Sequence, residues 1–587
     1  MSKSAGTSVG RGSNAARGPG RDGAKRRIGS LGPDGDSRRR AWLAYPAVIL
    51  LALLPLVPAL LLPYLPTVDG PAHVLDAYVM AHYGSPHYDV LRQYYVLSAS
   101  PTPNLLTQVL LAGLLRVLSP GTAEKVFAVV DVTLFAVGVT YAVRSVDRRS
   151  TFLATLAAPL ATGYLFYFGF YNFSLGTGLS LFTIGLFLRC RGRWTGTRTA
   201  VFLVMVVATA SAHLLPFGMA ALAVTVTVLT DLLSGLRWHR ATSTRRTWSV
   251  LAVTVRQDAL PPLLALVLPT ALTGLFLLHS PNIHGAGTEQ VRDLAAGRAE
   301  GASTFQLRHL ARVTVGQVTV YSWEELALGL MLFGMIALLV LLAVRQRPRP
   351  AKSPLLPFTG MIVLCVGLYV VFPDTLGTLA FINVRFALFG LLFTLLALAA
   401  APHRRRVRIA AVAVAIIVAV GLPIARIAPQ RHYTAELREY ASAAAVLRPG
   451  STFVTFRAWR DPSPIDRYGY YDPTAHQDSR IAMASQTVQL NHLDGRYDYF
   501  PAHFRNLDRL GARISDLDEP RLWLQLLIQS GADRSRPDYI LVWGRRRTDN
   551  ASQAQPVYRE AMQRLNAAYR RVWISSPQGL LEVYVRR

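Results

Sequence analysis

Residues 68–83 read VDGPAHVLDAYVMAHY and directly follow the first long apolar run of the chain, residues 42–65. That run is long enough to cross a bilayer and longer than the core of a signal peptide, and no small-residue cleavage motif follows it. It therefore predicts an uncleaved first membrane span. The acidic side chains that come directly after it are expected at a membrane surface.

The same stretch predicts a short helix. Asp69 precedes Gly70 and Pro71, an order typical of a helix N-terminus, and the helix is expected to run to about residue 81. His73 and Asp76 follow Asp69 by four and seven positions, which places all three side chains on one helix face. Spacing alone favours a helix cap with two solvated polar residues, so the surrounding architecture has to decide between that interpretation and a functional site.

Composition places the chain in the membrane. It has 587 residues, of which 51% are hydrophobic, and its mean hydropathy is +0.29. The apolar residues occur in long runs, which is typical of a polytopic membrane protein. The net charge of +28 is then better explained by cytoplasmic loops than by a nucleic-acid partner.

Eleven apolar runs are predicted to span the membrane: 42–65, 122–143, 151–168, 173–188, 199–213, 215–235, 260–279, 323–344, 355–372, 384–401 and 409–425. The run at 104–118 is also apolar, but as a helix it reaches only about 22 Å against a hydrocarbon core of about 30 Å. We expect it to lie along the membrane or to re-enter it.

The arginines in the loops predict the orientation. Loops 144–150, 189–198, 237–258, 345–352 and 403–408 carry 3, 4, 5, 4 and 4 Lys or Arg. The short loops that alternate with them, around residues 169–172 and 213–217, carry none, so the basic loops are expected to be cytoplasmic. Residues 1–40, with ten Lys or Arg and three Asp, are predicted to be a disordered cytoplasmic tail.

With the N-terminus inside and eleven spans, three regions are expected outside: residues 66–121, residues 280–322 and the tail 429–587. Residues 41–428 then form the membrane domain. The tail is less apolar and alternates predicted strands (452–456, 539–543, 571–575, 580–585) with predicted helices (433–447, 555–569). It is predicted to be a small extracytoplasmic α/β domain.

Ionisable side chains at or inside the spans are candidate site residues because burying them in lipid is costly. For Asp131, in the middle of a span, a structural hydrogen bond and a functional role are equally supported. His213 and Glu324, at outer ends of spans, have simpler explanations as an interfacial residue and a favourable charge at a helix N-terminus. Arg385, in FINVRFALF, favours function, since its planar guanidinium suits a phosphate; snorkelling to lipid headgroups is the alternative.

Several chemistries lack sequence support. There is no Walker loop, GxGxxG strand unit, HExxH or GxSxG motif, so nucleotide-driven reactions, zinc proteolysis and α/β-hydrolase chemistry are not indicated. The two cysteines, Cys190 and Cys365, fall in predicted spans, where neither a disulfide framework nor a cysteine metal site is expected.

In its order of features the chain resembles the GT-C class of integral-membrane glycosyltransferases, which includes protein O-mannosyltransferases and arabinosyltransferases. The shared features are an acidic motif after the first span, a juxtamembrane helix, about a dozen spans, a late arginine at the outer side and an extracytoplasmic C-terminal domain. Many members carry paired acids after the first span. This sequence has Asp69-Gly70-Pro71 there, and its next acid is Asp76.

The resemblance implies a bacterial enzyme of the plasma membrane that takes a sugar from a polyprenyl-phosphate donor to a glycan, lipid or protein acceptor of the cell envelope. Asp69 would be the catalytic base and Arg385 would stabilise the leaving phosphate. The substrate-binding set implied by this comparison is His73, Asp76, His213, Glu324 and Arg385, with a divalent cation as an optional cofactor. Residues 468–478, YGYYDPTAHQD, are either an acceptor-binding segment or an ordinary loop.

Two other functions remain open at this stage. A transporter or flippase of lipid-linked saccharides would use the same arginine without chemistry, and Asp131 is the residue that most favours it. A catalytically silent protein on the same fold is the third alternative.

Overall fold

A computed structural model describes residues 34–98, 102–242, 255–280, 307–346, 355–375, 380–459, 471–505, 519–529 and 536–587. The chain divides into two compact units, residues 1–43 and 44–587. Most of the predicted tail 1–40 lies outside the described residues, and its last residues open helix α1.

The membrane part is helical, as expected. Within the described ranges, eight helices are long and apolar enough to cross a membrane, and three further apolar helices of the predicted spans, Phe152–Phe168, Gly196–Ala212 and Leu355–Val371, are shorter. Eight and three make the eleven that the sequence predicts. The segment predicted to be too short, α5 (Leu105–Leu115), has 11 residues and reaches only about 17 Å.

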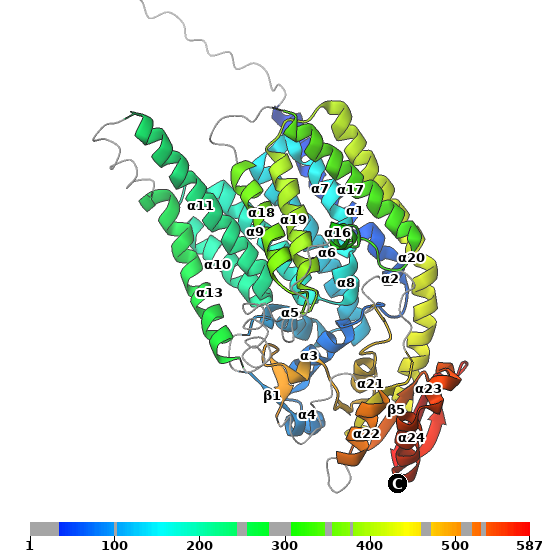
Figure 1. The fold of residues 1–587 in the computed structure, drawn as a ribbon. Helices are drawn as coiled ribbons and strands as arrows, with labels where there is room; N and C mark the ends of the chain where they lie inside the picture. Colours follow the sequence, from blue (N-terminus) through cyan, green and yellow to red (C-terminus); the bar gives the residue numbers. More distant parts are fainter. Residues whose placement is uncertain are drawn as a thin grey trace, which may run out of the picture. The chain divides into compact units, whose positions relative to one another are not determined.

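The helices of the membrane part are α1 (Asp34–Leu53), η1 (Leu54–Leu56), α2 (Val57–Leu61), α6 (Pro120–Val146), η3 (Arg148–Ser150), α7 (Phe152–Ala157), η4 (Ala158–Thr162), α8 (Tyr164–Phe168), α9 (Tyr171–Cys190), α10 (Gly196–Ala212), α11 (Leu214–Thr242), η5 (Val255–Ala259), α13 (Leu260–His279), α16 (Leu307–Val315), α17 (Trp323–Val344), α18 (Leu355–Val371), α19 (Ile382–Ala399) and α20 (Arg405–Ala441) (Figure 1). Prolines break the first and third spans into short pieces, since each proline removes a backbone hydrogen bond.

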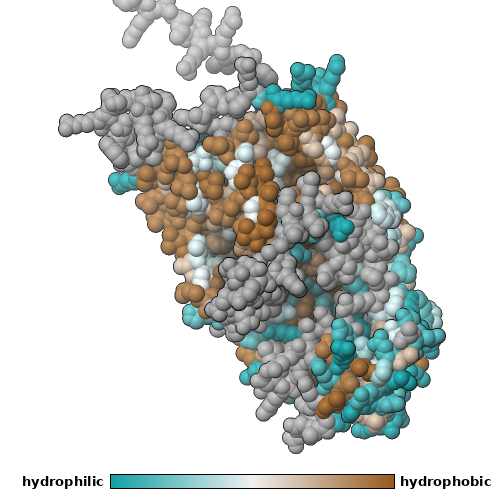
Figure 2. Space-filling model, in the orientation of Figure 1, coloured by the Kyte–Doolittle hydropathy of each residue, from teal (hydrophilic) through white to brown (hydrophobic). Residues whose placement is uncertain are grey.

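Close helix packing depends on small residues. Helices α6 and α9 share an extensive interface, where a Cβ added to Gly138 would lie 2.6 Å from the backbone oxygen of Gly178. In a bilayer, helices associate through such close contacts of small residues because lipid supplies no hydrophobic driving force between them. Apolar side chains cover the long helices on the face shown in Figure 2, and polar side chains gather over the C-terminal elements.

The loop after the first span contains α3 (Gly70–His82), η2 (Pro86–Tyr88), α4 (Asp89–Tyr94) and β1 (Tyr95–Leu97), followed by α5. Strand β1 pairs in antiparallel register with β4 (Ala502–Phe504), so Val96 lies opposite His503. Two segments about 400 residues apart in sequence are thereby joined beside α3.

The C-terminal part contains a five-stranded mixed sheet in the order β3-β2-β5-β7-β6. Its elements are η6 (Ser442–Ala445), β2 (Thr452–Arg457), α21 (Asp478–Ser485), β3 (Val488–Gln489), η7 (Asp494–Arg496), α22 (Pro520–Gln529), β5 (Tyr539–Trp543), η10 (Arg545–Arg547), α23 (Asn550–Ala554), α24 (Pro556–Ala568), β6 (Tyr569–Ile574) and β7 (Leu581–Arg586). Strand β5, YILVW, is buried along its whole length, as a central strand covered on both faces should be.

The predicted strands and the helix at 555–569 are found within a few residues of their expected bounds. The helix expected at 433–447 is confirmed as far as Ala445, but it is not separate, because α20 continues from the membrane part to Ala441 without a break and η6 follows it directly. The expected domain boundary at residue 428 therefore falls inside a helix.

Candidate functional site

Asp69 is held by its backbone and not by a helix-capping bond. It occupies the N-cap position of α3, but its side chain makes no capping hydrogen bond. Its backbone N–H donates to the carbonyl of Phe168 at 2.8 Å, and its carboxylate Oδ1 lies 3.6 Å from Nε2 of His476. The predicted helix is confirmed, and the predicted cap is wrong in its side-chain role.

A C-terminal segment fixes the backbone just before Asp69. The Tyr471 hydroxyl donates to the carbonyl of Pro66 at 2.5 Å, the Gln477 amide to Thr67 O at 3.2 Å, and Nη2 of Arg480 to Leu65 O at 3.1 Å. The expectation that residues 468–478 bind an acceptor concerns this segment. Its first three residues lie outside the described ranges, and the remainder is almost entirely buried against the Asp69 loop.

A buried carboxylate lies beside the same loop. Glu124, near the start of α6, accepts a hydrogen bond from the Tyr171 hydroxyl at 2.9 Å and lies 2.9 Å from Nη2 of Arg480. The Thr67 hydroxyl also donates to it at 3.4 Å. Arg480 thus neutralises one acid at the edge of the membrane part while its other contacts hold the Asp69 loop.

His73 is tied to the C-terminal part. Its Nδ1 lies 2.6 Å from Oδ2 of Asp494 on η7, and both side chains are buried. Burial lowers the pKa of His73, but the carboxylates of Asp494, Asp69 and Glu124 outweigh burial and raise that pKa above its ordinary value.

Asp76 lies behind this pair and is fully buried. Burial and the Asp494 carboxylate raise the pKa of Asp76 well above its ordinary range, with the Ala502 backbone amide opposing the rise. Asp76 therefore interacts electrostatically with Asp494. The interpretation of Asp76 as a solvated polar residue is wrong, because its side chain is fully buried.

Arg385 and His213 meet at the outer end of the helices. Nη1 of Arg385 lies 3.1 Å from Nε2 of His213, and the guanidinium stacks over the rings of Phe170 and Phe173 at 4.5 and 5.1 Å. Arginine has only N–H donors, so Nη1 of Arg385 donates to Nε2 of His213. Nε of Arg385 is buried and makes no hydrogen bond among the described residues, so an anionic oxygen could accept from it.

Backbone conformations at the site are unusual. Phe381, which directly precedes α19, and His476 both have positive φ angles, 58° and 56°. Left-handed backbone at a non-glycine residue costs free energy and is found preferentially at functional sites. Here the two residues lie next to the arginine-bearing helix and next to Asp69.

Electrostatic contacts join these groups into one site. The Asp69 carboxylate interacts with the Arg385 guanidinium, and His73 interacts with His213. Four of the six predicted residues, Asp69, His73, His213 and Arg385, are thereby brought together.

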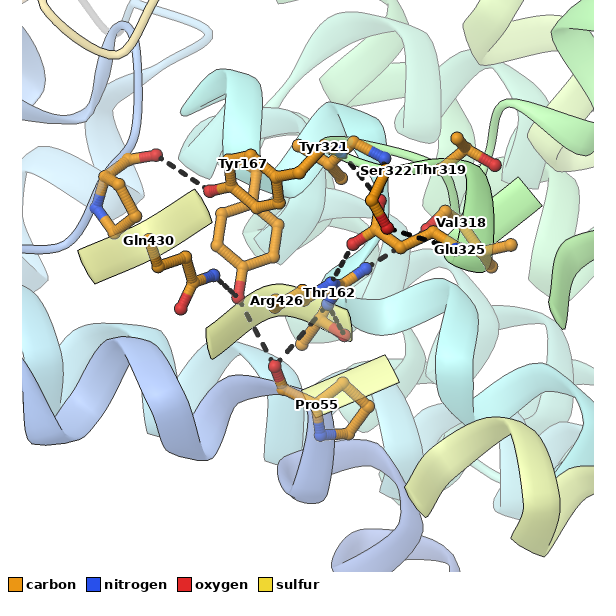
Figure 3. Close-up of polar contacts among 12 residues, drawn as sticks. Pro55, Thr162, Tyr167, Val318, Thr319, Tyr321, Ser322, Glu325, Arg426 and Gln430 are labelled. Carbon is orange, nitrogen blue, oxygen red and sulfur yellow. Dashed lines mark hydrogen bonds and ion pairs between the residues drawn. The ribbon is translucent and has the colours of Figure 1, made fainter. Parts of the chain in front are cut away.

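Glu324 is not part of this group. It lies exposed on the first turn of α17, and no contact among the described residues joins it to the other predicted positions. The adjacent acid, Glu325, is fully buried and pairs with the equally buried Arg426 at 2.7 Å (Figure 3). The predicted residue, Glu324, is therefore the exposed neighbour of Glu325, which forms the buried ion pair.

The Glu325–Arg426 pair organises the ends of four elements. Nη2 of Arg426 donates to Val318 O at 3.1 Å, while Nη1 lies near Pro55 O and the Thr162 hydroxyl, at 3.5 and 3.4 Å. Glu325 Oε2 accepts from the backbone N–H groups of Val320 and Tyr321 (Figure 3). These contacts satisfy backbone groups of the loop before α17 and the Pro55 carbonyl, which lies where prolines break the first span.

The network continues to the site through tyrosine hydroxyls. Tyr321 OH lies 2.7 Å from Tyr471 OH, and both hydroxyls point to the carbonyl of Pro66, three residues before Asp69. A chain of hydrogen bonds therefore connects the buried Glu325–Arg426 pair to the backbone just before Asp69.

Two expectations on metals and thiols can be compared with the structure. Among the described residues, no group of three or more His, Cys, Asp and Glu side chains is placed to hold a metal ion. Cys190 and Cys365 are both buried and unpaired, in separate helices.

Four further residues of the candidate site were not predicted from the sequence: Glu124, Tyr171, Arg480 and Asp494. Glu124 had a usable signal, an acid at the edge of an apolar run. Asp494 had none, because its partner His73 lies about 400 residues away in sequence. His476 lies in the segment 468–478 that the sequence singled out, but its place beside Asp69 was not predicted.

Comparisons with known proteins support the fold. The sequence matches no family model, and a search of curated proteins gave no significant match. Among solved structures, ArnT from Cupriavidus metallidurans bound to undecaprenyl phosphate matches with a TM-score of 0.50 at 11% identity, over 94% of this chain and 98% of that one. The apo state of the same protein gives a TM-score of 0.50 at 10% identity, over 93% and 98% of the two chains.

The arabinofuranosyltransferase AftD from Mycobacteria is less similar, with a TM-score of 0.45 at 14% identity over 94% of this chain and 41% of that one. The near-complete coverage of both chains in the ArnT comparison confirms the fold that the resemblance implies. The chain is a polytopic helical membrane protein with a GT-C-type fold and a C-terminal mixed sheet.

Proposed function

We propose that this chain is a membrane glycosyltransferase that transfers a sugar from a polyprenyl-phosphate donor to an acceptor hydroxyl. The fold is shared with a protein whose structure holds undecaprenyl phosphate, which supports a lipid-linked donor. The observation that carries the proposal is one site that holds a carboxylate not used as a helix cap, Asp69, and a buried guanidinium, Arg385, whose Nε–H makes no hydrogen bond among the described residues.

Asp69 and Arg385 have separate roles in the proposed reaction. The acceptor oxygen attacks the anomeric carbon of the donor while its proton passes to the Asp69 carboxylate, which acts as a general base. The bond from the anomeric carbon to the phosphate oxygen breaks, and the phosphate keeps the electron pair. Arg385 donates to the phosphate as its charge grows, and the burial of Arg385 strengthens the interaction.

The site is expected to face the extracytoplasmic side. The arginine-rich loops alternate with loops lacking Lys and Arg, and the Asp69 loop lies on the side opposite to the basic ones in that alternation. The acceptor belongs to the cell envelope under this orientation, as a glycan, a lipid or a protein.

The test uses the full chain, purified in detergent and supplied with polyprenyl-phosphate sugars and envelope acceptors. We expect release of free polyprenyl phosphate by the parent chain and a loss of about a hundredfold or more in Asp69→Asn. Because asparagine keeps the shape of the side chain and removes only its charge, thermal unfolding of this variant should be nearly unchanged. Asp549→Asn, at an exposed helix cap where Asn serves equally well, is the control and should keep parental turnover.

The opposite result points to transport. A flippase forms no product in detergent, which has no compartments. If the parent chain releases no polyprenyl phosphate but moves the donor lipids across proteoliposome bilayers, the transferase proposal is wrong and Asp69 becomes a binding or gating residue.

A further inference from the structure

The His73–Asp494 pair has the geometry of a base and the group that orients it. Asp494 approaches Nδ1 of His73 at 2.6 Å, and the two side chains are only 6% and 1% exposed. Nδ1 is thereby the donating nitrogen, which leaves Nε2 of a neutral ring with a free lone pair. No hydrogen bond to Nε2 is formed among the described residues.

Neighbouring groups leave Asp494 as the charged partner of His73. The raised pKa of Asp76 favours its neutral, protonated form. Burial lowers the pKa of His492 to about 4, so that ring is neutral, and it bonds to Ala72 O at 3.1 Å. The Asp494 carboxylate thus interacts with the His73 ring.

Other ionisable or charged groups also act on His73 or on its partner Asp494. They come from the α3 entry, α3 itself, α6, α9, the α10–α11 link, β1 and the η7 region: Asp69, Asp76, Glu124, Tyr171, His213, Tyr95, His492 and Asp494. Among those acting directly on His73, the acids Asp494, Asp69 and Glu124 favour a positive charge on its ring.

We propose that His73 and Asp494 form a proton relay that returns Asp69 to its basic form after each transfer. The proposal rests on the proposed function. His73 lies four residues after Asp69 on the same helix, so the two side chains are neighbours on one face. In this arrangement His73 is a catalytic residue and Asp494 is a positioning residue that acts through it.

The step balances as one proton transfer. Asp69 leaves the sugar transfer as a carboxylic acid, holding the proton of the acceptor hydroxyl. That proton passes to Nε2 of His73, directly or through one water, which regenerates the Asp69 carboxylate and forms an imidazolium. The Asp494 carboxylate balances the positive charge, and the imidazolium then releases its proton to water through the small exposed part of its ring.

Asp494→Asn tests the relay. The amide keeps the shape and can still accept from Nδ1, but it removes the charge that raises the pKa of His73. Only neutral His73 accepts a proton, so kcat of the parent chain should fall on the acidic side, through the pKa of His73. In the variant that acidic limb should move to lower pH by about one to three units, and the plateau should fall by about tenfold or more.

A merely structural role gives a different result. In that case Asp494→Asn lowers turnover equally at every pH and leaves the acidic limb in place, which overturns the relay. Asp549→Asn removes the same charge from an exposed position and should leave both the limb and the plateau unchanged.

A second variant keeps the test decisive if Asp494→Asn does not fold. His73→Ala should lose turnover, and imidazole added to the medium should restore part of it, whereas the absence of any restoration overturns the relay. These outcomes are separate from the proposed function, which fails only if the parent chain itself transfers no sugar.

Discussion

The planar shape of the Arg385 guanidinium, and not only its charge, should affect kcat. Its guanidinium stacks on two phenylalanines and meets His213 at 3.1 Å. Lysine keeps the positive charge but loses the planar fork and the stacking. We therefore expect Arg385→Lys to lower kcat by about tenfold to a hundredfold and to change donor affinity much less, since an interaction that strengthens in the transition state shows mainly in kcat.

The matched control is Arg189→Lys. Arg189 also stacks on an aromatic ring, that of Tyr141 at 4.0 Å, but it lies near the end of α9 on the predicted cytoplasmic side. It should leave both constants unchanged. A rise in the donor dissociation constant as large as the loss in kcat would show that Arg385 binds the ground state, and the leaving-group role would be wrong.

At the scale of single residues, the sequence predicted what local chemistry can indicate. An acid after a span, a histidine four positions later and an arginine inside an apolar helix all stand out, because each is costly unless it is used. The choice between Glu324 and Glu325 did not follow from sequence. Both acids open the same helix, and only the position of Arg426, about 100 residues later, decides which is buried.

Among the elements, the turn between α8 and α9 controls where Asp69 lies. Gly169 in this turn has φ +96°, and a Cβ added there would lie 2.8 Å from the Asp69 nitrogen. Gly169→Ala should therefore displace Asp69 and strain the turn, which costs about 1–2 kcal/mol for the left-handed backbone alone. We expect a lower melting temperature and a fall in kcat of about a hundredfold, the usual effect of a small misplacement at a reacting group.

Gly113→Ala provides the comparison for this substitution. Gly113 lies in α5 with open space around its Cβ position, so alanine should leave activity unchanged and slightly stabilise the helix. Parental activity in Gly169→Ala would mean that the α8–α9 turn does not position Asp69.

The buried ion pair joins elements in a different way. Arg426→Met leaves the Glu325 carboxylate buried without its charged partner (Figure 3), a loss that typically costs about 3–5 kcal/mol. We expect a clear fall in melting temperature in detergent. Glu324→Gln, at the exposed neighbour on the same turn, should have no measurable effect.

The double variant Glu325→Gln with Arg426→Met should recover part of the loss, because it removes both charges and keeps one acceptor for the backbone N–H groups of Val320 and Tyr321. If Arg426→Met unfolds at the parental temperature, the pair does not stabilise these helix ends.

At the scale of elements, periodicity and length were sufficient for most of the fold. The apolar runs gave the spans, and alternating segments gave the strands of the C-terminal sheet. The helix from residue 433 was predicted, but its fusion with the last span into α20 was not, because the polar end of α20 differs from the membrane run before it.

For the whole molecule, the sequence could not predict that the membrane part and the C-terminal part both contribute residues to the candidate site. Asp69, His73, His213 and Arg385 come from the membrane part and its first loop, and Asp494 with the His476 segment comes from the C-terminal part. No local pattern encodes a contact across 421 residues, such as that between His73 and Asp494. The sequence analysis therefore assigned the tail as a separate domain, whereas its residues complete the candidate site.

The orientation of the chain is the last prediction, and the helix count makes it testable. Thr197, at the start of α10, lies in a loop predicted to be cytoplasmic, and Asn566, on α24, lies in the region predicted to be outside; both are exposed. Between them the described residues contain seven apolar helices: α10, α11, α13, α17, α18, α19 and α20. An odd number of crossings places the two positions on opposite sides.

In a variant without Cys190 and Cys365, which are both buried, single cysteines at the two positions can be labelled with a membrane-impermeant maleimide. We expect Asn566→Cys to react on spheroplasts and Thr197→Cys only after permeabilisation. The reverse pattern would invert the orientation. Reaction of both from one side would show an even number of crossings, and because a 17-residue helix reaches only about 26 Å, either α10 or α18 would be the helix that fails to cross.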